Sequence, residues 1–568
     1  MGRAGARLGG HPGASRGAAR RLRRLADHRG RPGCAGHRRG KHPAVRPVGR
    51  PADALNDARR HKVRRCAMRR VGLAGTALVL VSATACSGGA VSGMGDGDGT
   101  LTLAVGVTAT PWDLASAGLG DYINYYEPVF DSLVRLDRYA EATPNLATSW
   151  RYDTSRTVLT MKLRKGVRFT DGTALDAAAV KANLLHTKEG TNEAAGKLRA
   201  IRTVDAVNPS TVAIHLSAPD PSLITSLGDP SGMVASPKAL DGKKGPVGSG
   251  PYVLNKSGTT NGSVYTFTRN RDYWNTKAFP FKKIVIRTIS DPTARLNALL
   301  GEQVDWARID PRSASQVKGR GLQVSSHVDA VEGLYIWDRA GKIVPALGKV
   351  KVRQALNYAF DRDAIAKKIN MGYAFATSQM AIPESGAYEK SLQRTYPYDP
   401  GKARKLLAEA GYPHGFTVTM PDVSSVAAGQ QAVMTQALED IGVKVKTKKV
   451  PSTELFTSLQ RGKYAMSWFK LASYRPWDYI STQLTADGAW NPAKDFDPKL
   501  AKLIATARKA TGARQNELFK QINRYVQTNA FNAPWDVLDS VHGVSNSIKV
   551  TPQPFESAIP IYQMTPAS

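Results

Sequence analysis

The chain has 568 residues, 42% of them hydrophobic and 22% charged, and its formal net charge is +33. These proportions are typical of a soluble globular protein long enough for two or three domains. All three cysteines, Cys34, Cys66 and Cys86, lie in the first 86 residues, so the rest of the chain has no disulfide framework. Residues 1–86 contain 21 basic and 3 acidic residues, and the remainder contains 58 and 43. More than half of the net charge therefore precedes residue 87, which removes most of the support for a nucleic-acid-binding function.

Residues 1–67 are rich in Arg, Gly, Pro and His and have almost no apolar periodicity. Such a segment cannot bury a core. A complete export signal follows it, so we interpret residues 1–67 as a non-native or disordered extension, with translation beginning near Met68. A basic tail that binds nucleic acid is the alternative.

The next segment has the three parts of a secretory signal. Arg69-Arg70 precede an apolar run from Val71 to Val81, and small residues lead to Cys86. The apolar run is shorter than the roughly 20 residues that span a bilayer, which argues against a transmembrane helix. We therefore predict a lipoprotein signal peptide at 68–85 and a lipid anchor on Cys86. Ala83 departs from the Leu or Val that usually stands three residues before the cysteine.

Residues 86–100 are rich in Gly, Ser and Asp, which predicts a flexible tether with a reach of roughly 20 Å. An alternating strand pattern begins at 101–107. A second strand pattern at 157–163 passes through a turn at 164–166 into 167–169, which predicts a β region rich in hairpins.

Later segments have helical spacing. Apolar residues at 352–360 lie on one face of a predicted helix, and a second helix has Asp399-Pro400 at its start and Gly411 at its end. A parallel βαβ unit is expected next, with a strand at 416–420, a helix at 426–441 and a strand at 443–447. Alternation predicts a strand at 464–468. Further helices are expected at 498–510 and 515–528, before an apolar segment at 534–538.

Motifs for enzyme chemistry are missing. None of the five histidines after Cys86 lies three to five residues from another histidine or from a cysteine, so we expect no metal site. No Gly-Lys pair is followed by Ser or Thr, and neither G-x-S-x-G nor G-x-G-x-x-G occurs after Cys86. We therefore expect no cofactor and no catalytic residue, although a triad assembled from distant residues stays open.

Several motifs in chain order resemble those of the family 5 extracellular solute-binding proteins, the dipeptide, oligopeptide and nickel-type receptors of ABC importers. The motifs are Tyr126 to Asp137, Pro144 to Trp150, Leu163 to Gly172, Gly248 to Tyr252, Arg269 to Trp274, Val352 to Arg362 and the Asp399-Pro400 helix. They extend over about residues 100–540, nearly the whole chain after Cys86.

The resemblance implies an α/β fold, the two-lobed periplasmic-binding-protein type II fold with an extra domain inserted in lobe one. Lobe one would comprise 101–142, 246–335 and 528–568, the inserted domain 143–245, and lobe two 336–527. Ligand would bind between the lobes and draw them together by hinge closure. The closed form would then dock on a permease.

The resemblance also bears on the ligand. Relatives that bind free peptides carry an aspartate for the peptide amino terminus, and Ser473 stands at the matching position here. A serine hydroxyl cannot make the charge-assisted bond to an ammonium group, which weakens standard peptide recognition. Aromatic side chains near this position could bind sugars, cyclic peptides or cations. The candidate ligand-binding residues are Tyr126, Glu127, Trp337, Asp338, Trp468, Ser473, Tyr474 and Trp477.

Three hypotheses follow for the function. The first is a lipid-anchored importer receptor for a peptide or peptide-like solute. The second is the same scaffold with an oligosaccharide or a metal chelate as ligand, and the third is a lipid-anchored hydrolase or solute sensor. In the first, the expected partners are the solute, the permease subunits and the outer face of the cytoplasmic membrane, with no nucleic acid, and we expect a monomer.

Overall fold

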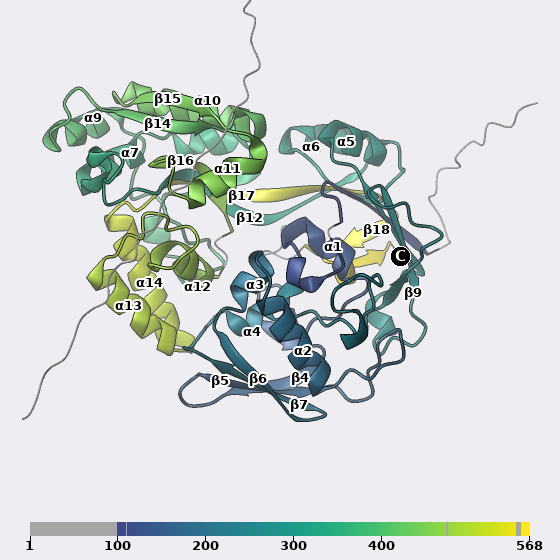
Figure 1. The fold of residues 1–568 in the computed structure, drawn as a ribbon. Helices are drawn as coiled ribbons and strands as arrows, with labels where there is room; N and C mark the ends of the chain where they lie inside the picture. Colours follow the sequence, from purple (N-terminus) through teal and green to yellow (C-terminus); the bar gives the residue numbers. More distant parts are fainter. Residues whose placement is uncertain (1–98, 110, 473–474, 553–557, 568) are drawn as a thin grey trace, which may run out of the picture. The chain divides into compact units, whose positions relative to one another are not determined.

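The computed structural model describes residues 99–109, 111–472, 475–552 and 558–567. The predicted signal peptide, Cys86 and nearly all of the predicted tether lie outside the described residues, as do Ser473 and Tyr474. Mixed sheets and helices make up the described part, as Figure 1 shows.

The largest sheet has nine strands in the order β16-β12-β17-β11-β1-β10-β9-β8, with β13 paired to β17. Strand β1 is parallel to β10 and β11, and the other pairs are antiparallel. The strands are β1 Thr100–Val105, β8 Tyr252–Leu254, β9 Val264–Arg269, β10 Lys283–Thr288, β11 Trp306–Arg308, β12 Gln323–Ile336, β13 Ala374–Ala376, β16 Met466–Leu471 and β17 Ala533–Val544. The strand predicted at 101–107 is confirmed as β1, and the segment at 534–538 lies within β17.

A second sheet of four antiparallel strands has the order β4-β5-β7-β6, and helix α2, Ala177–Lys188, contacts β6 and β7. Its strands are β4 Ala147–Tyr152, β5 Val158–Leu163, β6 Ile201–Asn208 and β7 Thr211–Leu216. The predicted β region is confirmed, but residues 167–169 do not join this sheet. They form a local turn closed by the bridge between Arg168 and Ala174, because Gly172, at φ +79°, reverses the chain there.

The predicted βαβ unit is confirmed. Strands β14, Thr417–Asp422, and β15, Lys444–Lys449, are parallel, and helix α10, Ser424–Asp440, connects them. The preceding helix α9, Pro400–Glu409, also has the predicted ends. The Asp399 carboxylate accepts a bond from the Lys402 N–H at 2.8 Å, and Gly411 has φ +86° after the last turn.

The remaining regular elements are short hairpins and helices. Strand β2, Val134–Leu136, pairs with β3, Ala142–Pro144, and β18, Ile548–Val550, pairs with β19, Met564–Pro566. The other α-helices are α1 Ile123–Tyr126, α3 Glu193–Lys197, α4 Leu223–Ser226, α5 Pro292–Leu300, α6 Ala314–Gly319, α7 Val350–Tyr358, α8 Arg362–Ala364, α11 Ser452–Gln460, α12 Pro476–Tyr479, α13 Pro498–Lys509 and α14 Gly512–Thr528. Helices α7, α13 and α14 confirm the helical spacing of the sequence.

The strand predicted at 464–468 begins two residues later than expected. Strand β16 starts at Met466, and every side chain from Tyr464 to Phe469 is buried. Alternation therefore did not separate a core face from a solvent face here, because β16 is covered on both sides.

Two glycines of the Gly248 to Tyr252 motif lie against the backbone of the segment after α1. A Cβ on Gly248 would lie 2.0 Å from the Val129 carbonyl oxygen, and one on Gly250 would lie 2.5 Å from that carbonyl group. The Gly250 N–H donates to the Val129 oxygen at 2.8 Å. Glycine at these two positions therefore allows the two backbone segments to approach closely.

Candidate functional site

Strands β12 and β17 are the two longest strands of the described chain, and they connect the two ends of the nine-stranded sheet. Strand β17 pairs with β11 through its last residues and with β12 along its whole length, while β12 also pairs with β16. The register shifts between Val328 and Ala330, so Asp329 is the extra residue of a β-bulge. Such bulges redirect a side chain out of the regular pleat.

The Asp329 carboxylate joins strands from opposite sides of this crossing. Its Oδ2 atom lies 3.0 Å from an Arg308 guanidinium nitrogen on β11 and 3.2 Å from the Lys470 Nζ atom on β16. Arg308 also lies 3.5 Å from the Asp121 carboxylate. We call Asp121, Arg308, Asp329 and Lys470 the bulge cluster.

Charge and exposure differ within the bulge cluster. Burial alone would raise the pKa of Asp329, but the Lys470 and Arg308 cations outweigh it and lower this pKa to about 2. Asp329 is therefore ionised at neutral pH. The side chains of Arg308 and Lys470 are 28% and 39% exposed. A buried acid thus holds two cations at positions that solvent reaches.

Next to the bulge cluster, β12 and β17 carry a pair of buried carboxyl groups. Glu332 and Asp536 are opposite each other in the β12–β17 ladder, and both are fully buried. Glu332 accepts hydrogen bonds from the indole N–H groups of Trp468, at 2.8 Å, and Trp535, at 2.9 Å. The Asn370 amide donates to both acids, at 3.2 and 2.7 Å.

Burial raises the pKa of both of these carboxyls, and the charge of Glu332 raises that of Asp536 further. Ionising both of two adjacent buried acids costs much free energy, because the two charges repel each other and lack solvent. The pair therefore retains protons at a pH where an exposed pair would not. Trp468 is 8% exposed, and its orientation depends on the bond to Glu332.

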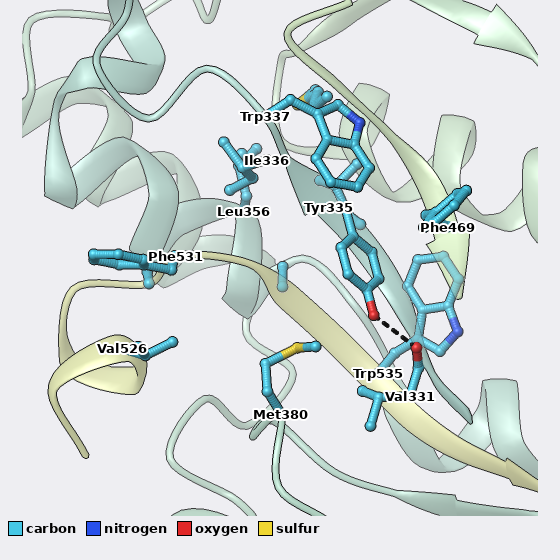
Figure 2. Close-up of a cluster of buried hydrophobic side chains, with 14 of the residues drawn as sticks. Val331, Tyr335, Ile336, Trp337, Leu356, Met380, Phe469, Val526, Phe531 and Trp535 are labelled. Atoms are coloured by element: carbon cyan, nitrogen blue, oxygen red, sulfur yellow. Dashed lines mark hydrogen bonds between the residues drawn. The ribbon is translucent and has the colours of Figure 1, made fainter. Parts of the chain in front are cut away.

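Trp337 lies among other rings at the end of β12, as Figure 2 shows. Its ring stacks on Tyr335 at 5.4 Å and meets Phe469 edge-on at 5.5 Å. The Trp337 indole donates to the Ser467 hydroxyl at 2.9 Å, and the residue is 1% exposed. The structure therefore places Trp337 in the core between β12 and β16.

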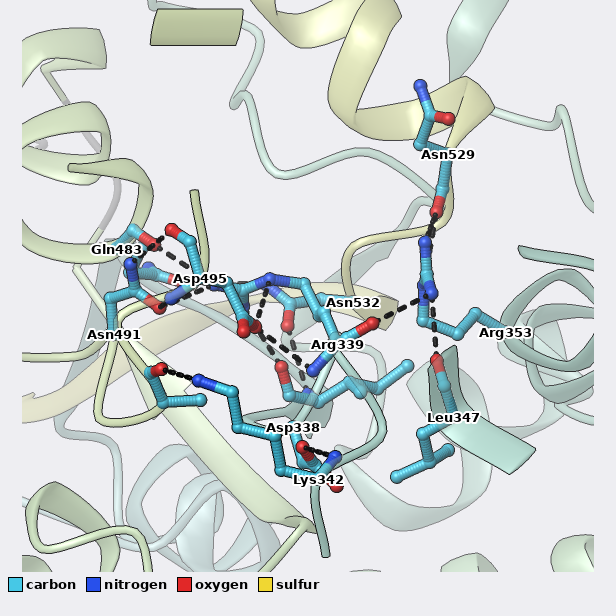
Figure 3. Close-up of polar contacts among 12 residues, drawn as sticks. Asp338, Arg339, Lys342, Leu347, Arg353, Gln483, Asn491, Asp495, Asn529 and Asn532 are labelled. Atoms are coloured by element: carbon cyan, nitrogen blue, oxygen red, sulfur yellow. Dashed lines mark hydrogen bonds and ion pairs between the residues drawn. The ribbon is translucent and has the colours of Figure 1, made fainter. Parts of the chain in front are cut away.

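Asp338 closes the turn after β12. Its two carboxylate oxygens accept from the N–H groups of Lys342, Ile343 and Val344 at 2.7 to 2.8 Å. Figure 3 shows this turn beside the buried Arg339. The hydrogen bonds described for the Asp338 carboxylate are thus all with backbone N–H groups of the same turn.

Two buried arginines fix the segment around this turn. Arg339 donates to the Ile336 carbonyl and the Asn491 amide oxygen, at 3.0 and 2.9 Å. Arg353 donates to the carbonyls of Leu347 and Asn529, at 2.8 and 3.0 Å, and burial lowers its pKa to about 10. This network, drawn in Figure 3, ties α7 to the C-terminal end of α14.

Tyr126 and Glu127 are buried at the end of α1. The Tyr126 ring contacts Trp112 edge-on at 6.3 Å, and Glu127 accepts from the Ile561 N–H at 2.6 Å. Glu127 and Asp131 also line a recess of about 400 Å³. Burial raises the pKa of Asp131, although Arg135 and three hydrogen bonds oppose that effect.

Trp477 is 3% exposed on the short helix α12, where its ring lies 6.4 Å from Phe519. The Arg508 guanidinium lies over the indole at 5.5 Å from its centre. A recess of about 280 Å³ opens beside it, lined by Pro476, Tyr479, Ile480, Phe519, Met380, Ala381, Ser385, Ala387, Ile522 and Asn523.

The structure brings some candidates together and separates others. Trp468 lies on β16, two residues before Lys470 of the bulge cluster, whereas Trp337 follows the end of β12, eight residues after Asp329. Tyr126 belongs to a different core cluster from Trp337, Trp468 and Trp477. Sequence reasoning missed Arg308, Asp329, Glu332 and Lys470. A signal existed, since Asp329 and Glu332 are charges within the otherwise apolar stretch from Val328 to Ile336.

Comparison with known proteins identifies the family. The profile of the bacterial extracellular solute-binding proteins, family 5, matches residues 141–492. The chain belongs to this family. Among curated relatives, it is 29% identical over 471 residues to the glutathione-binding protein GsiB of Pectobacterium atrosepticum, which covers 79% of this chain and 90% of that protein.

Solved structures of similar fold agree with the family 5 assignment. One is NikA from Brucella suis in complex with Fe(III)-EDTA, with a TM-score of 0.71, 21% identity, and coverage of 82% of this chain and 99% of that one. Another is DppA from Helicobacter pylori in complex with the peptide STSA, with a TM-score of 0.70, 20% identity, and coverage of 83% and 98%. The fold is thus the two-lobed type II periplasmic-binding-protein fold.

Membership of family 5 confirms the main predictions from the motifs. The protein is a solute-binding protein of an ABC importer, acts outside the cytoplasm, and is a receptor, not an enzyme. In the part of the chain that the structure describes, no helix combines the length and apolar character needed to cross a bilayer.

Proposed function

We propose that the protein is a lipid-anchored receptor that binds a peptide or peptide-like solute and delivers it to the permease of its ABC importer. The observation that carries the proposal is the family 5 match over residues 141–492, with a curated relative named as glutathione-binding. Glutathione is a tripeptide with two carboxylates and one ammonium group. With Ser473 in place of the aspartate that binds a peptide ammonium group, we infer that the site recognises the solute mainly through its carboxylates.

The bulge cluster is the proposed centre of the solute site. Arg308 and Lys470 are partly exposed cations, and each can bond a carboxylate while Asp329 keeps it in place. Trp468 and the segment with Ser473 and Tyr474 would contact the rest of the solute. For Tyr126, Glu127, Trp337, Asp338 and Trp477, whose described contacts are within the chain, solute contact stays a prediction.

This placement also gives hinge closure a physical basis. Arg308 belongs to β11 and Lys470 to β16, which the sheet order separates by the crossing strands β17 and β12. Asp329 already holds both cations together, so a solute bonded to them would contact both proposed lobes at once and would favour the closed arrangement in which it keeps both contacts. The proposed lobes are 101–142 with 246–335 and 528–568, and 336–527, with 143–245 as the inserted domain.

A thermal-shift screen tests the solute class. We expect glutathione or another acidic di- or tripeptide to raise the melting temperature, because a solute at 100 times its Kd adds roughly 2.7 kcal/mol of stability. If only an oligosaccharide or a nickel chelate raises it, the peptide proposal is wrong. Turnover of a chromogenic ester without any such shift would contradict the receptor itself.

A charge substitution tests the site. Lys470→Gln should weaken solute affinity at least 10-fold, because one charge-assisted bond is lost. Lys463→Gln, an exposed lysine just before β16, is the matched control and should leave affinity unchanged. Equal affinity of both variants and the parent protein would remove Lys470 from the site.

A further inference from the structure

One face of the β14–β15 pair is a row of lysines and threonines. In the parallel register, Lys444 lies beside Thr417 and Lys446 beside Thr419, while Lys448 follows beside Pro421. Side chains two residues apart on a strand share a face and lie roughly 6.6 Å apart. All three lysines and both threonines are exposed. We call Lys444, Lys446 and Lys448 the lysine row.

On the opposite face of this pair, the apolar β14 side chains are buried. Val418 and Met420 point into the core, where Met434 and Leu438 of α10 pack against them. Figure 1 shows α10 alongside β14 and β15. Since the core fixes one face, the strand register fixes the lysine row on the other.

The charges of the lysine row are not neutralised within the described residues. No ion pair or side-chain hydrogen bond found there involves the Nζ atom of Lys444, Lys446 or Lys448. The acid paired with β15 in register is Asp422, which lies opposite Lys449 and not in the row. The Ser424 hydroxyl and N–H bond to Asp422 and lower its pKa, with a smaller contribution from Lys449.

Protection of a sheet edge explains part of this pattern. Lysines on an edge strand hinder pairing with a second molecule, and β15 has only β14 as a neighbour. One or two charges are enough for that purpose, however. Three lysines on one face, with no acid between them in the register, make a continuous positive surface.

We propose that the lysine row is a docking surface for the anionic headgroups of membrane phospholipids. Protein interfaces are depleted in lysine and enriched in aromatic residues, and this face offers lysine, threonine and Pro421 but no aromatic side chain. A free phosphate ion would need converging donors in a pocket, whereas the lysine row is spread along a strand. Evenly spaced point charges on an exposed sheet suit a layer of headgroups. The protein acts outside the cytoplasm as a receptor for a membrane permease, so a membrane surface is within its reach.

Docking by this surface would hold the β14–β15 region against the bilayer independently of solute binding. Each lysine near an anionic surface strengthens binding by about fivefold, so the row as a whole is worth on the order of 100-fold. The interaction should weaken steeply with salt because it is electrostatic.

Vesicle binding of the full chain tests the proposal. Every variant carries Cys86→Ser, so that no acyl chain contributes, and all share the same basic residues 1–86. The test variant is Lys444→Gln/Lys446→Gln/Lys448→Gln. The control is Lys165→Gln/Lys256→Gln/Lys277→Gln, which removes three exposed lysines elsewhere. The probe is vesicles of phosphatidylglycerol and phosphatidylcholine, with phosphatidylcholine alone as the neutral reference.

The expected result is a loss of affinity on the order of 100-fold for the test variant at low salt and a much smaller loss for the control. Hydrogen exchange of residues 444–449 should slow in the parent protein when anionic vesicles are added, and inorganic phosphate should not have this effect. Solute affinity and melting temperature should be the same in both variants, which shows that the fold and the proposed receptor function are intact.

Three outcomes would overturn the proposal. Equal losses in the two variants would mean that only net charge matters. Unchanged vesicle binding with new self-association of the test variant would assign the lysines to edge protection alone. Unchanged vesicle binding with weaker binding to the purified permease would make the partner a protein.

Discussion

Asp329 and Asp536 are buried aspartates on paired central strands, yet their surroundings move their pKa values in opposite directions. Asp329 faces two cations, which lower its pKa to about 2. Asp536 faces the Glu332 carboxyl, and burial together with that charge raises its pKa. The side chains within reach of each acid, not burial itself, decide which aspartate is charged.

We expect Asp329→Asn to lower stability at neutral pH by about 2 kcal/mol, the free energy that corresponds to its lowered pKa. Because this pKa is lower in the folded state, the contribution is present above about pH 4 and is lost as the pH falls to about 2. Urea denaturation of the parent and variant across this range measures it. Asp272→Asn, at an exposed position, is the control, and equal acid sensitivity of Asp329→Asn and the parent protein would contradict the assignment.

Asp536→Asn should have the opposite pH dependence. Folding raises the pKa of Asp536, so its contribution is present at low pH and is lost as rising pH removes the proton from the folded protein. The variant should therefore gain about 1–2 kcal/mol over the parent at alkaline pH and little at pH 5. Chemical denaturation at pH 5 to 9 measures the difference, and Glu302→Gln is an exposed control. A parent protein equally stable across that range would rule out the raised pKa of Asp536.

At the scale of elements, close contact between two backbone segments restricts which residues are allowed, as side-chain packing does. Gly248 and Gly250 allow the 248–252 segment to lie on the residue 129 backbone, whereas Gly172 turns the chain in open space. The three glycines all belong to family motifs, but the physical reason for glycine differs between them.

Alanine substitutions should separate these reasons. Gly248→Ala should destabilise by roughly 3 kcal/mol or more, because its Cβ would overlap the Val129 carbonyl oxygen. Gly172→Ala should cost about 1 kcal/mol for its positive φ. Gly196→Ala, in a helix with open space around it, should be neutral or stabilising. Thermal melting of the three variants gives the order, and a harmless Gly248→Ala would show that the contact relaxes easily.

Local elements were the most predictable part of this fold. The α9 helix could be read from Asp399, Pro400 and Gly411 because its capping groups are adjacent in sequence. The βαβ unit after it was equally clear, since its strands alternate and its helix has a 3.6-residue period. The pairing of β5 with β7 could not be predicted, because residues 167–169 follow β5 closely in sequence while β7 is distant.

The solute site could be predicted least. The bond from Lys470 to Asp329 joins residues 141 positions apart, and the bond from Trp535 to Glu332 joins residues 203 positions apart. No local pattern reports such pairings. A ring-rich segment drew attention to Trp468, but aromatic residues serve the core as readily as a binding site. Buried charges on apolar strands are the better signal in this chain.

At the scale of the whole molecule, the proposed anchor decides where the receptor stays. Cys86→Ser should release the protein from cells into the medium, because the acyl chains can no longer attach it to the membrane. Fractionation of cells and medium measures this, with Cys66→Ser as the control because Cys66 precedes the predicted signal. Unchanged membrane attachment of Cys86→Ser would place the anchor elsewhere.

The position of β17 has a consequence for how the protein is made. Strand β1 starts at Thr100, but the strand that joins it through β11 to β12 and β16 starts only at Ala533. A chain that emerges from an export pore with its N-terminal part first therefore cannot complete its central sheet until nearly all of it has crossed. Until then β11 and β12 lack their shared partner, and chaperones on the far side have the whole period of translocation to act.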